Sequence, residues 1–197
     1  EAGFFKDQCV DMMVWGPNGW RVADRDEQPR ADISLESMKT LKTPFKVGGK
    51  VTPGNASGLN DGACASIFLS GEECKKLGVK PKMRMVSYAF AGVDPSIMGF
   101  GPVPATDKAL KNAGLTFKDI DIVELNEAFA VQAVAFAKYY GLSIPHDDRM
   151  NPNGGAIAIG HPLASSGVRL SIQLAKYFEQ NPSARYGLTT MCIGLGM

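Results

Sequence analysis

The feature that most constrains this fold is an alternation of strand-like and helix-like segments between residues 84 and 193. The sequence predicts strands at 84–90, 120–125 and 186–193 and helices at 106–113, 127–140 and 168–178. Gly114 and Gly141 follow two of these helices, where a left-handed residue commonly ends a helix. Strands that alternate with helices in this way form a sheet covered by helices. The expected fold class is therefore α/β, with a mixed sheet flanked by helices on both faces.

The part before residue 84 has a weaker pattern. We expect irregular structure over 1–30, a short helix at 34–41 with Ser34 as its N-cap, a buried strand at 62–69, and a helix at 72–77. Hydrophilic turn residues at 80–82 separate this part from the later alternation. We therefore predict three parts of the chain, at 1–30, 31–83 and 84–197.

Charge and apolar content exclude two classes of partner. The 197 residues carry 21 Lys and Arg against 20 Asp and Glu, a net charge of +1. This balance argues against nucleic-acid binding through a basic stripe, so no nucleic-acid partner is expected. The longest apolar stretch, at 128–137, is too short to cross a bilayer, so no membrane partner is expected either.

Cysteine and histidine usage indicates the compartment and argues against a metal. The four cysteines show no C-x-x-C spacing and no signal peptide is visible, which indicates free thiols in a reducing compartment. The two histidines do not lie at metal-ligand spacing, so no metal site is expected. The chain begins with Glu1 instead of Met, and we expect the natural sequence to continue upstream.

Asn126 follows the strand predicted at 120–125. Open α/β sheets bind ligands beyond the carboxyl ends of their strands. An amide at that point can hold a water molecule or donate to an oxyanion. Asn is also among the best N-cap residues, and the residue taken alone favours this structural role.

His161 and Cys192 lie on two further loops. His161 is in a glycine-rich segment at 153–162, and its near-neutral pKa suits proton transfer. A structural histidine that ties down the loop is an equal alternative. Cys192 ends the strand predicted at 186–193, where cysteine is usually a small buried hydrophobe. The glycines that follow it, Gly194 and Gly196, allow a tight turn whose N–H groups face a ligand.

These loops also carry a family resemblance. The segments Asn-Glu-Ala-Phe at 126–129, Gly-Gly-Ala-Ile-Ala-Ile-Gly-His-Pro at 154–162 and Cys-Ile-Gly at 192–194 resemble, in this order, three motifs of the thiolases. Segments at 54–63, 92–95 and 98–102 are similar to the family too. The resemblance implies a thiolase-like fold, here an incomplete part of its two-domain layered architecture. It assigns 1–30 to the end of a CoA-binding loop domain, 31–83 to part of the N-terminal thiolase domain, and 84–197 to the C-terminal domain with its last strand truncated.

The resemblance implies acyl transfer: cleavage of a 3-ketoacyl-CoA by coenzyme A to acetyl-CoA and a shortened acyl-CoA, or the reverse Claisen condensation. His161 would activate a nucleophilic cysteine and form one oxyanion hole with a water held by Asn126. Cys192 would be the acid/base, and the Gly194 N–H would contribute to a second oxyanion hole. The remaining matched positions would line the path of coenzyme A and acyl-CoA: Arg30, Phe45, Ser57, Phe129 and, near the acyl group, Met98. Coenzyme A would be a substrate, with no permanently bound cofactor.

Two departures from the family pattern qualify this implication. No segment of the form Asn-x-x-Cys-x-Ser-Gly, which carries the family's nucleophile, occurs in the 197 residues. The chain alone is therefore expected to be inactive and to need the N-terminal half of a thiolase as partner. A complete protein would be a cytoplasmic homodimer or homotetramer. Ala164 stands where the family usually has glycine, and it would be strained if its φ were positive.

A second class of function stays open beside the enzyme. The chain is alternatively a non-catalytic module that binds coenzyme A or an acyl group, or one subunit of a split thiolase. Asn126, His161 and Cys192 together argue against a purely structural role, because a binding module needs no acid/base pair.

Overall fold

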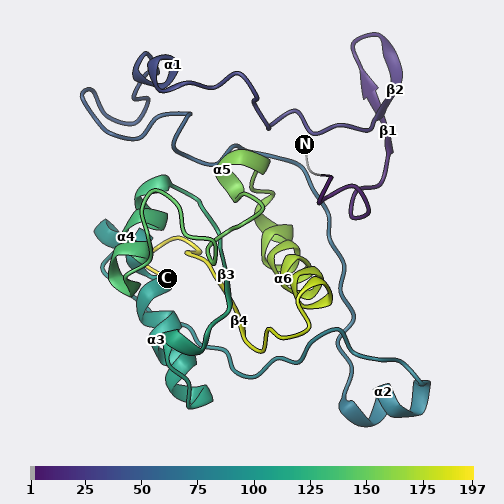
Figure 1. Cartoon of the computed structure of the whole chain (residues 1–197). Helices are drawn as coiled ribbons and strands as arrows, with labels where there is room; N and C mark the ends of the chain where they lie inside the picture. The colour runs from purple at the N-terminus through teal and green to yellow at the C-terminus, as the bar shows by residue number, and fades with distance from the viewer. Residues whose placement is uncertain (1–2) are drawn as a thin grey trace.

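The computed structural model describes residues 3–197 and is centred on two parallel strands (Figure 1). Strand β3 (Ile122–Leu125) pairs with β4 (Gly187–Thr190), with Leu125 opposite Thr190. On the other side of β3, the backbone of Val123 accepts from Asn151 N at 2.9 Å and donates to Arg149 O at 2.7 Å. All four residues of β3 are buried.

Helices cover both faces of this strand pair. Figure 1 shows α3 (Pro102–Ala113) and α4 (Ala130–Tyr140) on one side and α6 (Leu163–Gln180) on the other. The side chains of Val123 and Leu125 belong to the buried core on the α3 and α4 side, with Val103, Leu110, Ile120, Phe136, Ala137 and Leu142. On the opposite side, Leu174 and Phe178 of α6 lie 3.0 Å from the place of a Cβ on Gly187. The α/β fold class with helices on both faces is thus confirmed.

The helices predicted from the sequence are present with shifted ends. Helix α3 begins at Pro102, because proline suits the first turn of a helix, and α6 extends to Leu163 and Gln180. Gly114 and Gly141 end α3 and α4 in the left-handed conformation, with φ of 67° and 69°. Helices α1 (Leu35–Lys39) and α2 (Gly71–Leu77) are short and begin after the N-caps Ser34 and Ser70.

Residues 1–30 are not all irregular, so that expectation is wrong for its middle part. Strands β1 (Met12–Gly16) and β2 (Gly19–Ala23) form an antiparallel hairpin. Trp15 and Trp20 face each other across it in an edge-to-face contact, with ring centroids 5.5 Å apart. Such cross-strand aromatic pairs stabilise hairpins. The two-residue turn between flanking aromatic residues was the signal in the sequence. Residues 1 and 2 of the predicted segment lie outside the described part.

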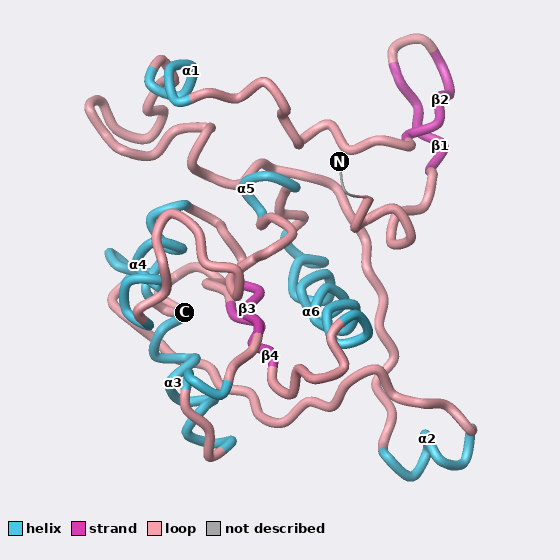
Figure 2. The backbone as a smooth tube through the Cα atoms, in the orientation of Figure 1, coloured by secondary structure: helices cyan, strands magenta, loops and turns pink. Residues whose placement is uncertain are grey.

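The predictions of strands at 62–69 and 84–90 are also wrong. Both segments are long connections in Figure 2, and no strand of the described part pairs with either. The first is exposed instead of buried, with Ile67 87% and Phe68 70% exposed. A strand exists only where a neighbour takes its backbone hydrogen bonds. The second segment is held by side chains instead, since Ser87 Oγ donates to Ala109 O of α3 at 2.6 Å.

Three further helical segments were not expected. They are the 3₁₀ helices η1 (Pro95–Phe100) and η2 (Phe117–Asp119) and the single turn α5 (Ala156–Ile159) inside the glycine-rich segment. Among residues 3–197, none of the helices combines the length and apolar character that a bilayer span requires.

Candidate active site

The carboxyl ends of β3 and β4 bring Asn126 and Cys192 to the same edge of the sheet. Asn126 follows β3 directly and its N–H donates to Thr190 O, the last residue of β4, at 3.0 Å. Cys192 lies two residues beyond Thr190 and is buried. Asn126 does not cap α4, which begins four residues later at Ala130. The N-cap interpretation is therefore wrong, and the fully buried Asn126 side chain is available for another role.

His161 meets Asn126 at this edge. Its Nε2 lies 3.2 Å from Asn126 Nδ2, and the ring is buried. Its Nδ1 lies 2.6 Å from Ser166 Oγ, which in turn lies 3.2 Å from the carbonyl oxygen of Pro162. One assignment of protons satisfies all three hydrogen bonds. The Asn126 amide donates to Nε2, Nδ1–H donates to Ser166, and Ser166 donates to the carbonyl oxygen of Pro162. The imidazole is then neutral, with its lone pair on Nε2.

Burial favours the uncharged form of both titratable groups. It lowers the pKa of His161, and the Arg169 guanidinium lowers it further. It raises the pKa of the Cys192 thiol, while hydrogen bonds to Gln132 and to the backbone of Cys192 act in the opposite direction. A neutral imidazole can accept a proton and a thiol can give one. The resting site therefore holds one base and one acid.

The loop that carries His161 is fixed to β3 through Asn151 and Glu127. The Asn151 side chain pairs with both backbone groups of Leu125, accepting its N–H at 2.8 Å and donating to its carbonyl at 2.9 Å. The same amide donates to Glu127 Oε1 at 2.8 Å, and Glu127 Oε2 accepts the Ile157 N–H at 3.3 Å. A Cβ on Gly155 would lie 2.1 Å from Glu127 Cδ, so this position requires glycine.

The sequence reasoning did not assign Glu127 and Asn151 to the site. The available signals were the acidic residue directly after Asn126 and the asparagine before the glycine pair. Asn151 has a φ of 48°, a left-handed conformation that asparagine tolerates better than most residues. Its side chain acts as a substitute strand partner for β3.

A segment from the N-terminal part runs along the site. Asn60 Oδ1 accepts the His161 N–H at 3.0 Å. Ser57 N donates to Ala128 O at 2.9 Å, and Ala56 forms an antiparallel bridge with Phe129. The structure therefore brings two of the predicted coenzyme A positions, Ser57 and Phe129, close together through the backbone contacts of 56–57 with 128–129.

The remaining predicted positions are in three other parts of the structure. Met98 is in η1, and this segment packs on α4. The contact is seen at Gly99, where an added Cβ would lie 3.6 Å from Cβ of Gln132. Gly194 has a φ of 89° and accepts the Met197 N–H at 3.0 Å, which closes the turn after Cys192. Arg30 and Phe45 are exposed on the N-terminal segments, and no hydrogen bond within residues 3–197 ties either side chain to the cluster.

Ala164 is not strained by the departure from glycine. It is the second residue of α6, and it is not among the described non-glycine residues with positive φ. The condition for a shifted loop is therefore not met.

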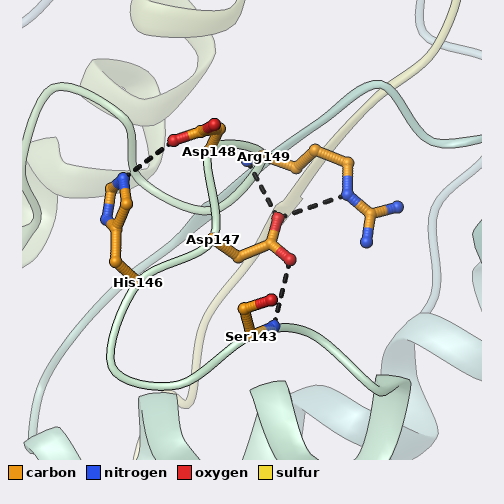
Figure 3. A network of polar contacts seen from close by, with 5 residues as sticks. All are labelled: Ser143, His146, Asp147, Asp148 and Arg149. Carbon is orange, nitrogen blue, oxygen red and sulfur yellow. Dashed lines mark hydrogen bonds and ion pairs between the residues drawn. The ribbon is translucent and has the colours of Figure 1, made fainter.

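A second polar cluster fixes the loop before Asn151 (Figure 3). Asp147 accepts the backbone N–H of Ser143 at 3.1 Å and both the N–H and Nε–H of Arg149, at 3.0 and 3.3 Å. These hydrogen bonds, that from Ser143 first, lower the pKa of Asp147. The exposed His146 and Asp148 pair at 3.0 Å on the outside of the loop. Asp147 thus shapes the turn that leads into the backbone contacts between Arg149 and β3.

The described residues contain no group of three or more His, Cys, Asp or Glu side chains placed to hold a metal ion. The four cysteines are free thiols, with Cys74 and Cys192 buried. The arrangement available for chemistry is therefore an amide, an imidazole and a thiol at one edge of an α/β sheet.

Comparison with known proteins assigns this chain to a family. A model described as "Thiolase, C-terminal domain" matches residues 79–197, and one described as "Thiolase, N-terminal domain" matches residues 1–72. The chain belongs to the thiolase family.

Several relatives match the chain along its length. It is 51% identical over all 197 residues to an acetyl-CoA acetyltransferase of Syntrophomonas wolfei, of which it covers 49%. The structure is similar to human mitochondrial 3-ketoacyl-CoA thiolase, with a TM-score of 0.89, 44% identity, and coverage of 99% of this chain and 48% of that one. It is also similar to the acetyl-CoA acetyltransferase of Bacillus anthracis, with a TM-score of 0.90, 39% identity, and coverage of 99% and 48%. The chain spans about half the length of these relatives.

Proposed function

We propose that this chain supplies the acid/base part of a thiolase site that transfers an acyl group between a 3-ketoacyl-CoA and coenzyme A. The observation that carries the proposal is the buried 3.2 Å contact between Asn126 and His161 beyond the end of β3. Cys192, beyond the end of the paired strand β4, adds the thiol at the same edge. The thiolase family membership supports this chemistry over other uses of the same three groups.

In this proposal His161 serves as the base for a cysteine nucleophile supplied by sequence outside the 197 residues. The Asn126 amide releases Nε2, whose lone pair takes the proton of that thiol, and the thiolate attacks the 3-keto carbonyl carbon. The developing oxyanion is stabilised by His161 and by a water held by Asn126. Asn126 Oδ1 is buried without a hydrogen-bond partner in the described part of the chain, which suits it to accept from such a water.

Cys192 serves as the acid in the cleavage direction. When the bond between C2 and C3 breaks, the electron pair passes to C2 and the thioester oxygen of the departing acetyl-CoA. Cys192 gives its S–H proton to C2, and the Gly194 N–H stabilises the enolate oxygen. The acyl group stays on the nucleophile as a thioester until coenzyme A attacks it. In the condensing direction Cys192 as thiolate removes the same proton.

The proposed path of coenzyme A runs past Arg30, Phe45, Ser57 and Phe129, with Met98 near the acyl group. The backbone contacts that bring Ser57 close to Phe129 support the inner end of this path. The structure of human mitochondrial 3-ketoacyl-CoA thiolase in complex with CoA, to which this chain is similar with a TM-score of 0.88, supports coenzyme A as the ligand class. We further propose a cytoplasmic location, consistent with four free thiols, and assembly into a homodimer or homotetramer.

The test is thiolysis of acetoacetyl-CoA, followed by the loss of the enolate absorbance after coenzyme A is added. The chain is assayed alone and after co-expression with the half of the S. wolfei relative that it does not match. We expect turnover only in the second case. His161→Asn and Cys192→Ser should each lower the rate by about 10² or more. Cys74→Ser is the matched control, because Cys74 is equally buried but lies on α2, and it should leave the rate unchanged.

Two outcomes would refute the proposal. Turnover by the chain alone that survives in Cys192→Ser would mean that a different cysteine performs the chemistry. Binding of coenzyme A, measured by calorimetry, without turnover in the complemented protein would favour the binding-module alternative.

A further inference from the structure

Gln132 is a buried amide directed at the sulfur of Cys192. It belongs to α4, its side chain is 1% exposed, and its Oε1 lies 3.4 Å from Cys192 Sγ. Its Nε2 is buried and has no hydrogen-bond partner in the described part of the chain. The aliphatic part of the side chain lies against Gly99 of η1. A Cβ added to Gly99 would lie 3.6 Å from Cβ and 4.0 Å from Cγ of Gln132. The two ends of one amide are thus in unequal states, one bonded to the thiol and one unused.

This inequality matches the chemistry of an acid/base cysteine. In the thiol state, sulfur carries a proton and can donate it to a carbonyl oxygen. In the thiolate state, sulfur carries only lone pairs and needs a donor. An amide has one end of each kind, and rotation about its last side-chain torsion exchanges them without moving the helix.

No charged side chain within residues 3–197 shifts the pKa of Cys192. The contributions come from burial, which raises it, and from Gln132 and the backbone of Cys192, which lower it. A cation in place of Gln132 would hold Cys192 as thiolate, and a carboxylate would hold it as thiol. A neutral amide allows both states, which a group that takes and gives a proton in one reaction cycle requires.

We propose that Gln132 is a positioning residue for Cys192, accepting its S–H in the thiol state and, with the amide turned, donating an N–H to its sulfur in the thiolate state. The use of both states in a reaction rests on the proposed function. The hydrogen-bond exchange itself is a property of this chain.

The exchange is tested by titrating the thiolate absorbance of Cys192. The parent for this test carries Cys9→Ser, Cys64→Ser and Cys74→Ser, so that Cys192 is the one thiol present. Gln132→Met removes both ends of the amide at similar size. We expect it to lower the thiolate fraction at a given pH by about tenfold or more, because a hydrogen bond to a charged sulfur is lost.

Gln173→Met is the matched control. Gln173 is also 1% exposed and its Nε2 also lacks a partner in the described part, but it lies on α6. We expect its titration midpoint to equal that of the parent. Far-ultraviolet circular dichroism checks the fold of each variant. If Gln132→Met does not fold, Gln132→Asn decides, because it keeps an amide but withdraws it by one methylene and should shift the midpoint in the same direction.

A folded Gln132 variant that titrates like the parent overturns the proposal. The readout needs no turnover, so its failure is distinct from that of the proposed function. In the complemented enzyme, Cys192 acts as the acid in thiolysis, so its loss of a proton limits the alkaline side of the pH–rate profile. This limb should move with Gln132→Met and stay in place with Gln173→Met. A shifted thiol titration together with turnover that is independent of Cys192 would refute the proposed function and leave the exchange intact.

Discussion

We expect the free energy of unfolding of this chain to fall as pH rises from mildly acidic to mildly alkaline values, because of Glu124. Replacing Glu124 with Gln should remove this contribution. Glu124 lies in the middle of β3 and is 1% exposed, and its Oε2 has no hydrogen-bond partner in the described part. Burial raises its pKa from 4.5 to about 8, against the opposing attraction of Arg169 and with a further increase from Glu127. The folded chain therefore keeps this carboxyl protonated at pH values where the unfolded chain ionises it.

The sign and size follow from proton linkage. A folded-state pKa above the unfolded value contributes stability that is fully present below pH 4.5 and is lost as pH rises to about 8. The loss is at most ~1.4 kcal/mol for each pH unit in this window, so between about pH 5.5 and about pH 7.5 the free energy of unfolding should fall by about 2 kcal/mol on account of Glu124 alone.

The assay is urea unfolding of the parent and of Glu124→Gln at the two pH values, followed by circular dichroism. His161, whose lowered pKa acts in the opposite direction below pH 6.5, is present in both proteins and cancels in the comparison. Glu179→Gln is the control, because it makes the same substitution at an exposed carboxylate of α6, which pairs with Lys82. Parallel pH dependences for the parent and Glu124→Gln would mean that Glu124 is ionised beside Arg169, and would refute the reasoning.

Two further substitutions test the loop that carries His161. Gly155→Ala places a methyl group 2.1 Å from Glu127 Cδ, and it should lower the free energy of unfolding by about 1–3 kcal/mol in the same urea assay. Gly167→Ala is the control: a Cβ there lies inside α6 and 3.8 Å from its nearest described neighbour, so the free energy of unfolding should rise by up to ~1 kcal/mol. Equal effects of Gly155→Ala and Gly167→Ala would contradict the close contact at Gly155. Ser166→Ala removes the 2.6 Å partner of His161 Nδ1, so nitrogen NMR of the ring should show the proton distributed over both nitrogens. Ser165→Ala, which removes only a hydrogen bond to Pro162, should leave the Nδ1–H form intact, and an unchanged spectrum for Ser166→Ala would disprove the assigned proton placement.

Local signals in the sequence were sufficient for α1, α2, α3, α4 and α6, but not for the other helical segments or for all strands. Ser34 before α1 and Gly141 after α4 act within one turn of the chain, so their effect can be predicted from neighbouring residues. A strand depends on a partner that is distant in sequence. The apolar pattern at 62–69 resembles a buried strand, yet the segment is unpaired in the described part and Ile67 is exposed.

The same distinction applies to the site. The motifs predicted Asn126, His161 and Cys192 as site residues, but not the contacts that hold them. Asn151 reaches Glu127 across 24 positions, and its role depends on a turn that no periodicity indicates. Gln132 looks like one polar residue on an amphipathic helix, and only the folded structure shows its amide at the sulfur of Cys192.

Burial is the largest influence on the opposite starting states that the proposed reaction requires. The imidazole of His161 is charged when protonated, so a buried position lowers its pKa and leaves it ready to accept a proton. The thiol of Cys192 is charged when deprotonated, so the same kind of position raises its pKa and leaves it ready to give one. Arg169 adds to the effect on His161, whereas hydrogen bonds with Gln132 and the backbone of Cys192 oppose the effect on the thiol. The cost is that the reaction must form a buried thiolate in the condensing direction, and the unpartnered amide end of Gln132 is the group placed to lower that cost.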